Sequence, residues 1–244
     1  MKKWANGSFV RFRPDRVIES RAMAYYPVNL DITGQRCLVI GAGAVGTRKV
    51  NGLLTCGAKV TVVSITAGSR VRTLARDGII SCHCRAYRSG YLANVFLVIG
   101  ATNDNALNRH IYEDARKRQI LCNIADQPAL CNFILPAVVR RGNLVISVST
   151  SGQSPAFAKK LRRELEAVYG EEYAEFLELM GAIRKKLLAT NHAPEAHKPL
   201  FNALIEDGLV EMIRDGRNKE INALLSKVLG TGYDRKALMA VAGE

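Results

Sequence analysis

Apolar and polar positions follow a regular order from residue 36 to residue 124. Short apolar runs predict strands at residues 36–40, 59–64, 79–85, 95–101 and 120–124. Longer amphipathic stretches predict helices at residues 44–56, 69–77 and 106–117. Strands that alternate with helices at these lengths indicate a parallel, doubly wound sheet of the α/β class.

The pattern changes after residue 126. Two further strands, at 132–138 and 143–149, are separated by too few residues for a helical crossover, so an antiparallel pair is expected. Ser154 and Pro155 fit the cap and the first position of a following helix. Apolar positions at helical spacing then predict helices within 173–187, 200–213 and 220–229.

The first predicted strand runs into a Gly-x-Gly-x-x-Gly pattern. Gly41 allows a sharp turn, Gly43 lets the backbone approach a pyrophosphate, and Gly46 lets helix and strand pack closely. The free N–H groups of the following helix favour an anion. Glycines also occur in ordinary turns. The strand before, the helix after and a second strand at βαβ spacing favour a Rossmann-type dinucleotide loop formed by Gly41, Ala42, Gly43, Ala44, Val45 and Gly46.

Open parallel sheets bind ligands outside the carboxyl ends of their strands. The residues expected there are Ser64, Ile65, Thr66, Thr102 and Asn103. The second strand ends without the acidic residue that usually bonds the ribose of NAD, so these residues alone do not separate NAD from NADP. Ser64 or Thr66 is suited to hydrogen-bond a ribose hydroxyl.

Asp126 stands at the end of the fifth predicted strand. A carboxylate in a partly apolar cleft can act as a general acid or base. An aspartate that only caps the turn before Pro128 is an equal alternative. Asp104, by contrast, is expected to cap the helix that begins near Ala106.

A polar loop precedes the helix that starts at Pro155. Thr150, Ser151 and Ser154 could seat a carboxylate or a phosphate at this helix N-terminus, with Lys159 adding positive charge one turn along. A helix that is simply well capped by these hydroxyls is the alternative.

The formal net charge of +13 arises from 35 Lys and Arg against 22 Asp and Glu. This balance suits a polyanionic partner such as nucleic acid, an anionic membrane or a small polyanion. The absence of a helix-turn-helix or zinc-finger pattern and an aromatic content of only 7% argue against nucleic acid. No apolar run is long enough to span a bilayer.

The 6 cysteines are scattered through apolar patterns, which is typical of reduced thiols in a cytoplasmic protein. In a strand, Cys82 and Cys84 would share one face and His83 the other, so the three cannot converge on one metal ion, and no resident metal site is predicted. The isolated histidines are expected at the surface: His110, His192 and His197.

Five segments in order carry a resemblance to a known family: 41–49, 101–104, 122–126, 133–136 and 148–155. Together they resemble the precorrin-2 dehydrogenase/sirohydrochlorin ferrochelatase domain of siroheme synthases, over residues 23–232. The chain resembles the stand-alone form, because no methyltransferase domain follows.

The resemblance implies NAD-dependent oxidation of precorrin-2, a polycarboxylate tetrapyrrole, to sirohydrochlorin. In many members insertion of Fe²⁺ then gives siroheme. Asp126 falls on the family's essential aspartate, which would take up a proton. The family's NAD-contacting positions correspond to Ala44, Val45, Ile65 and Thr66. Thr150 stands where some members have a serine that is a phosphorylation site. The candidates for binding substrate carboxylates include Arg140 and Lys159.

The resemblance also implies a homodimer and a division of the chain. We expect a basic extension over 1–22, with Met23 as a possible natural start, and a Rossmann domain over 23–135. A β/α dimerisation segment follows over 136–168, and an all-helical domain over 169–244.

Two other functions stay open. A non-enzymatic Rossmann regulator that senses a nucleotide would share the glycine loop but would have no need of Asp126. A dehydrogenase that acts on a different small acid would need both.

Overall fold

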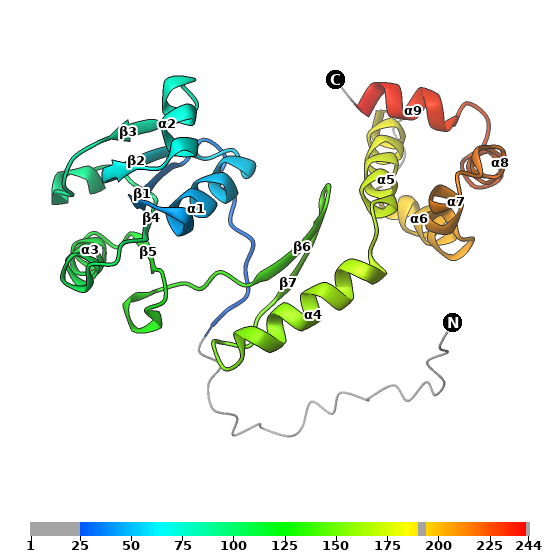
Figure 1. Cartoon of the computed structure of the whole chain (residues 1–244). Coiled ribbons are helices and arrows are strands. Elements are labelled where there is room, and N and C mark those ends of the chain that lie inside the picture. Colours follow the sequence, from blue (N-terminus) through cyan, green and yellow to red (C-terminus); the bar gives the residue numbers. More distant parts are fainter. Residues whose placement is uncertain (1–24, 190–193, 243–244) are drawn as a thin grey trace. The chain divides into compact units, whose positions relative to one another are not determined.

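The structure is a computed structural model that describes residues 25–189 and 194–242 (Figure 1). The predicted extension 1–22, Met23 and His192 lie outside these ranges. The chain divides into two compact units, Met1–Phe133 and Ile134–Glu244. Each unit is described by itself.

The first unit is built on a five-stranded parallel sheet in the order β3-β2-β1-β4-β5. Its strands are β1 (Arg36–Ala42), β2 (Lys59–Ala67), β3 (Ser81–His83), β4 (Leu97–Gly100) and β5 (Leu121–Ile124). Its helical elements are α1 (Ala44–Thr55), α2 (Ser69–Arg76), α3 (Asn105–Lys117) and the short 3₁₀ turns η1 (Ser89–Leu92) and η2 (Pro128–Leu130). The predicted α/β class is confirmed.

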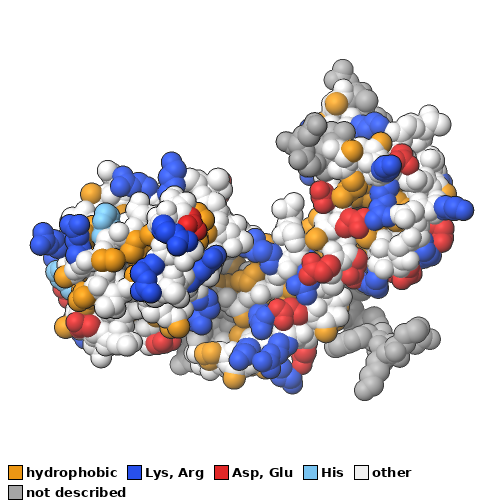
Figure 2. Space-filling model, turned by 45° about the horizontal axis from the view of Figure 1, so that its top comes forward, with side chains coloured by type: hydrophobic (Ala, Val, Ile, Leu, Met, Phe, Trp, Pro, Cys, Tyr) orange, Lys and Arg blue, Asp and Glu red, His pale blue; other side chains and the backbone are white. Residues whose placement is uncertain are grey.

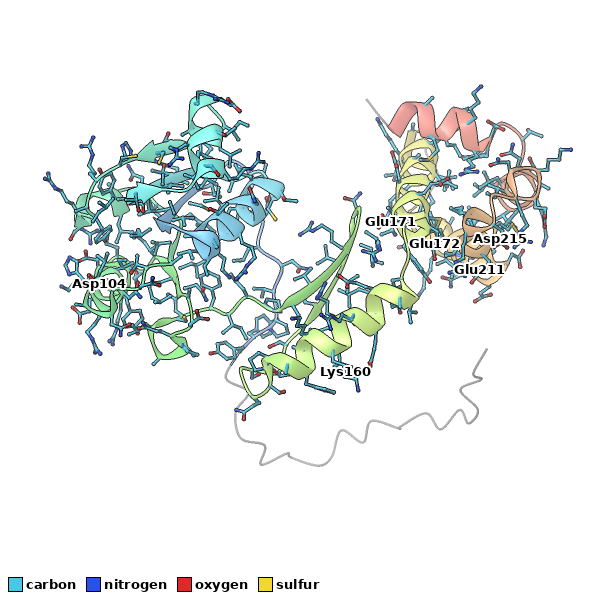
Figure 3. The ribbon with its side chains drawn as sticks, in the orientation of Figure 1. Asp104, Lys160, Glu171, Glu172, Glu211 and Asp215 are labelled. Atoms are coloured by element: carbon cyan, nitrogen blue, oxygen red, sulfur yellow. The ribbon has the colours of Figure 1, made fainter. Side chains whose placement is uncertain are left out.

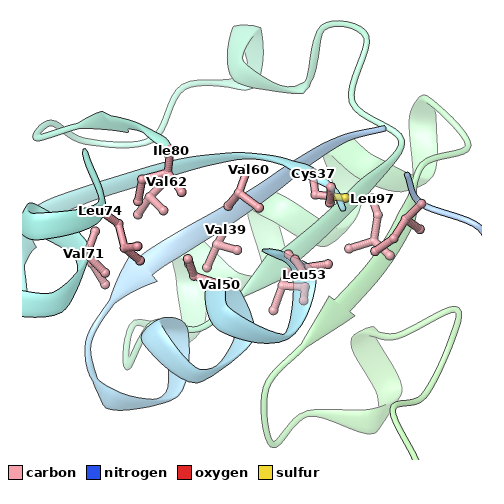
Figure 4. Packing of buried hydrophobic residues seen from close by; sticks show 14 residues of the cluster. Cys37, Val39, Val50, Leu53, Val60, Val62, Val71, Leu74, Ile80 and Leu97 are labelled. Atoms are coloured by element: carbon pink, nitrogen blue, oxygen red, sulfur yellow. The ribbon is translucent and has the colours of Figure 1, made fainter. Parts of the chain in front are cut away.

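Alternate residues of β1 pack into two hydrophobic layers, because successive side chains of a strand point to opposite faces. Cys37 and Val39 join the layer that α1 and α2 cover, where Val50 and Leu53 of α1 meet the sheet (Figure 4). The opposite layer contains Leu38 and Ile40 of β1. It is closed by Leu92 of η1 and by Ile111 and Ala115 of α3. A strand covered on both faces needs the apolar sequence that predicted it.

Local signals at helix ends act as the sequence predicts. The Asp104 carboxylate, labelled in Figure 3, accepts hydrogen bonds from the N–H groups of Ala106 and Leu107 at 2.9 and 3.0 Å and so caps α3. Gly57 follows α1 with a φ of 73°, the left-handed conformation that glycine adopts without strain at a helix C-terminus.

The second unit begins with an antiparallel hairpin, β6 (Ala137–Arg141) and β7 (Leu144–Val148), which confirms the antiparallel pairing. The strand prediction 132–138 was wrong in its bounds. The backbone N–H and side chain of Asn132 bond to Cys122 and Ile120 at the edge of β5, so the start of the predicted strand belongs to the first unit's sheet edge. Arg140 and Arg141 therefore lie within a strand, and the turn falls at Gly142 and Asn143.

Helices form the rest of the second unit: α4 (Pro155–Val168), α5 (Glu172–Ala189), α6 (Pro194–Glu206), α7 (Leu209–Arg214), α8 (Asn218–Leu229) and α9 (Arg235–Ala242). The single helix expected over 200–213 is divided, because Gly208 adopts a φ of 81° between α6 and α7. The core contains the predicted apolar face of α5, including Phe176, Ile183 and Leu187. His197 is buried within this unit, so its predicted surface position was wrong.

No helix in the described ranges is long and apolar enough to cross a membrane. All 6 cysteines are free thiols.

The buried layer under α3 should carry much of the first unit's stability. Ile111 is fully buried in that layer, whereas Ile79 is 53% exposed. We expect Ile111→Ala to lower the free energy of unfolding by about 2–5 kcal/mol, because the site loses apolar contacts and gains a cavity. Denaturant unfolding followed by circular dichroism measures this loss. Ile79→Ala is the matched control and should cost far less; equal losses would contradict the assignment of the core.

Candidate functional site

The strand order reverses between β1 and β4, which lie side by side while the chain leaves them in opposite directions. Loops that follow such a pair of strands separate and leave a crevice at the carboxyl edge of the sheet. The glycine loop follows β1 and residues 101–104 follow β4, so both predicted cofactor segments meet at this edge.

The glycine loop is held by backbone contacts that leave no room for side chains. A Cβ on Gly46 would lie 2.0 Å from the carbonyl oxygen of Gly41. A Cβ on Gly41, whose φ is +100°, would lie 2.3 Å from the carbonyl oxygen of Ala101. Gly43 differs, because nothing lies within 4 Å of its added Cβ. Gly41 and Gly46 therefore serve packing, and Gly43 leaves open space where a ligand can approach.

The N-terminus of α1 offers an anion site. Gly43 is the N-cap and supplies no side chain to the helix, and the first turn carries no acidic residue. The N–H groups of Ala44 and Val45 belong to this first turn, where N–H groups have no carbonyl partner within the helix. Together with the space over Gly43, this arrangement fits the pyrophosphate of a dinucleotide.

The end of β2 bulges outward beside the glycine loop. Ile40 pairs with Val63 and Ala42 pairs with Ala67, so Gly41 alone faces Ser64, Ile65 and Thr66. Ile65 is consequently 75% exposed, and Thr66 is exposed beside it. This bulge explains why an apolar strand presents a large apolar side chain at the cofactor edge.

Two hydroxyls that were predicted to bind cofactor are already bonded within the protein. Ser64 donates to the carbonyl of Thr66 at 2.7 Å and accepts the N–H of Ala42 at 3.2 Å. Thr102 donates to the buried side chain of Asn108 at 2.7 Å, and Asn108 donates back to the Thr102 carbonyl at 3.0 Å. Both hydroxyls shape their loops, while Asn103 is exposed.

Asp126 is exposed at the end of β5 and has a φ of 61°, a left-handed conformation that is uncommon outside glycine. Its neighbour Gln127 donates to Asn105, the first residue of α3, at 2.7 Å. The loops after β4 and β5 are thus joined at the same edge of the sheet. Neighbouring parallel strands lie about 4.8 Å apart, so Asp126 follows a strand roughly 10 Å from β1.

Sequence reasoning missed two side chains beside Asp126. Lys49, on α1, is half-buried, and burial lowers the pKa of its ammonium, as does Arg48, while Asp126 and Cys131 raise it. Asp126 and Cys131 thus both lie close enough to Lys49 to act on its charge. The signal that could have found Lys49 is its position one turn after Val45, on the same face of α1.

The predicted polar loop of the second unit caps its helix. Thr150 accepts the N–H of Ser154 at 3.1 Å, and Ser154 accepts the N–H of Phe157 at 3.2 Å. Ser151 is exposed with a φ of 51°. The capped-helix interpretation therefore describes Thr150 and Ser154 in this structure, although each hydroxyl keeps a hydrogen to donate.

Lys and Arg side chains occur on both units in the face that Figure 2 displays. Several of those on α4 pair within the helix: Lys160, labelled in Figure 3, lies 3.7 Å from Glu164, and Arg162 pairs with Glu166. Arg141 bonds to the carbonyl of Glu166 and lies 3.2 Å from Glu171. Arg140 and Lys159 are exposed.

The described ranges hold no group of three or more His, Cys, Asp or Glu that could bind a metal ion. His83 instead lies against the ring of Tyr91, with centroids 5.2 Å apart.

The sheet order, the glycine loop and the open α1 N-terminus define a Rossmann-type NAD(P)-binding protein. Comparison with known families agrees: residues 28–137 match the putative NAD(P)-binding family, and residues 141–167 match the sirohaem biosynthesis protein central family. The chain is similar to siroheme synthases and to a precorrin-2 dehydrogenase, as its motifs indicated.

Individual relatives extend the likeness over most of the chain. The siroheme synthase of Thioalkalivibrio sulfidiphilus is 34% identical over 214 residues, which are 88% of this chain and 44% of the relative. That of Nitrosococcus oceani is 31% identical over 211 residues, 86% of this chain and 45% of the relative. The chain thus spans less than half the length of these relatives. The solved structure of SirC, precorrin-2 dehydrogenase, matches with a TM-score of 0.71 and 28% identity, over 84% of this chain and 99% of SirC.

The open space over Gly43 yields a test of the dinucleotide site. We expect Gly43→Ala to fold with a stability loss below about 1 kcal/mol, because its Cβ meets no atom in the protein. Dinucleotide affinity should fall roughly tenfold or more, because the methyl group occupies the pyrophosphate's approach. Fluorescence titration with NADH measures the affinity.

Gly52→Ala is the matched control, since Gly52 is exposed on the same helix with nothing within 4 Å. It should stabilise the protein by about 1 kcal/mol and leave binding unchanged. Equal affinities in the two variants would place the dinucleotide elsewhere.

Proposed function

We propose that this chain catalyses the NAD-dependent oxidation of precorrin-2 to sirohydrochlorin in siroheme biosynthesis. The observation that carries the proposal is the exposed carboxylate of Asp126 at the same sheet edge as the dinucleotide loop. A protein that only senses a nucleotide has no need of such a carboxylate. The likeness to a precorrin-2 dehydrogenase, over 84% of this chain and 99% of that protein, supports this choice of substrate.

The cofactor is held chiefly by backbone groups in this proposal. The pyrophosphate lies over Gly43 and bonds to the first-turn N–H groups at Ala44 and Val45. Ile65 and Thr66 on the bulge of β2 contact the adenosine half. The bulge has no acidic residue that would exclude the 2′-phosphate of NADP, so its residues do not separate the two cofactors. We therefore assign NAD from the family resemblance.

The oxidation removes a hydride and a proton from precorrin-2. Bound NAD supplies the hydride acceptor. Asp126 takes up the proton as general base, because its carboxylate is exposed at this sheet edge, whereas the Asp104 carboxylate is used to cap α3.

Binding of the substrate falls to positive and polar groups, because precorrin-2 carries acetate and propionate side chains. Arg140 and Lys159 are exposed cations on β6 and α4. Ser151 is exposed in the loop before α4, where Thr150 and Ser154 can still donate. These groups are assigned to the substrate carboxylates.

The enzyme is proposed to work as a homodimer in the cytoplasm. Large apolar side chains are exposed around the hairpin and α4, including Leu135, Val145, Phe157 and Val168. A second copy would cover such side chains, and free thiols are the usual state of cysteine in that compartment.

The role of Asp126 is tested by Asp126→Asn. Asparagine tolerates the left-handed backbone found here, so the variant should fold. We expect kcat for sirohydrochlorin formation to fall about 10²–10⁴-fold, because the amide cannot accept the proton, with NADH affinity unchanged. The absorbance of sirohydrochlorin in mixtures of protein, NAD⁺ and precorrin-2 measures the rate.

Asp104→Asn is the control, because Asp104 follows the neighbouring strand β4 and caps α3. Asparagine caps a helix as well as aspartate does. It should retain activity within about twofold. Wild-type turnover in Asp126→Asn would refute the base assignment. If the wild-type protein bound NADH but produced no sirohydrochlorin, a regulatory or different dehydrogenase function would take its place.

Insertion of Fe²⁺, as a second substrate, is proposed for the same site. Chelation releases the pyrrole N–H protons, and Asp126 is positioned to accept them. Fe²⁺ or Co²⁺ added to sirohydrochlorin should be incorporated faster with wild-type protein than without it, and more slowly with Asp126→Asn. Equal rates with and without protein would restrict the enzyme to dehydrogenation.

A further inference from the structure

The segment 125–131, here called the Asp126 loop, carries the proposed base on a strained backbone. A left-handed φ costs a non-glycine residue free energy, so the surrounding structure must hold it in place. The two flanks of this loop are fixed by Asn132, which bonds to Cys122 and Ile120, and by Asn123, which donates to the Phe133 carbonyl at 3.1 Å.

Within the loop, the side chain of Cys131 bonds to the backbone on both sides of Asp126. The Cys131 thiol accepts the N–H of Ile124 at 3.2 Å and can donate to the carbonyls of Ile124 at 3.4 Å and Gln127 at 3.3 Å. Asn123 also donates to the sulfur at 3.6 Å. Ile124 precedes Asp126 by two residues and Gln127 follows it, so the thiol bonds on both sides of the strained residue.

The electrostatics agree with a protonated thiol that acts as a hydrogen-bonding group. Burial raises the pKa of Cys131, although the Ile124 N–H and the Lys49 charge act in the opposite direction. A protonated thiol keeps the hydrogen needed to donate to either carbonyl. A buried, protonated thiol is also a poor nucleophile, which argues against a covalent role.

We propose that Cys131 is a positioning residue. The hydrogen bonds that its thiol makes across the Asp126 loop hold the Asp126 carboxylate in its working orientation. This inference rests on the proposed function of Asp126. It assigns the geometry of the loop to hydrogen bonds of the sulfur, and not to the volume that the side chain fills.

Three substitutions separate hydrogen bonding from volume. Cys131→Ser keeps a donor and an acceptor at nearly the same place, Cys131→Val fills the space without either, and Cys131→Ala removes both. We expect kcat for sirohydrochlorin formation to fall about tenfold or more in the Val and Ala variants and to stay within about threefold in the Ser variant. KM for NAD should not change, since the glycine loop is untouched. The pH profile of kcat should shift in Val and Ala, because the surroundings of the base change.

Hydrogen exchange of the Ile124 amide gives a readout that does not depend on catalysis. Its protection should fall in the Val and Ala variants and persist in Ser, while thermal unfolding identifies any variant that fails to fold. Cys56→Ala, at a half-buried thiol beyond the end of α1, is the control and should leave kcat unchanged.

Full activity in Cys131→Val with loss in Cys131→Ser would overturn the proposal in favour of packing. Unchanged Ile124 protection in folded Val and Ala variants would overturn it as well. If wild-type protein formed no sirohydrochlorin, the proposed function would fail, while the exchange measurement would still decide whether Cys131 holds the loop.

Discussion

The carboxyl edge of the first sheet depends on a close approach of backbone to backbone. The carbonyl oxygen of Gly41 lies 2.0 Å from where a Cβ of Gly46 would be. The carbonyl oxygen of Ala101 lies 2.3 Å from where a Cβ of Gly41 would be. The end of β1, the start of α1 and the loop after β4 are therefore one packed unit. Because β5 pairs with β4 and Gln127 bonds to Asn105, the position of Asp126 follows from the same contacts.

Most of the first unit could be predicted from the sequence, because its signals are local or periodic. Buried strands require apolar runs, and Asp104 and Gly57 mark helix ends by their own chemistry. One error arose from a tertiary contact that overrides the local pattern, and another from the backbone conformation of one glycine. Asn132 bonds to the edge of β5, which delays the hairpin strand until Ala137, and a single left-handed glycine, Gly208, divides a continuous apolar pattern into two helices.

The candidate site was predictable to the level of strand ends and no further. The rule that ligands bind at the carboxyl ends of strands ranked the glycine loop and Asp126 without any structure. It could not say how each side chain is used, because that depends on neighbours from distant segments. Ser64 and Thr102 were predicted as ligands and are bonded to Thr66 and Asn108, whereas Lys49 and Cys131 were overlooked and approach Asp126.

These differences follow one physical pattern. A hydroxyl near a loop gains by bonding to the backbone that it sits on, so polar residues at strand ends and helix starts are often satisfied before a ligand arrives. In the described residues, the first-turn N–H groups of α1, which attract anions, have no side-chain cap, and the carboxylate of Asp126 is exposed at the same edge. The first suits a dinucleotide and the second suits proton transfer. Their combination at a single sheet edge supports the proposed dehydrogenase over a nucleotide sensor, which would need only the first.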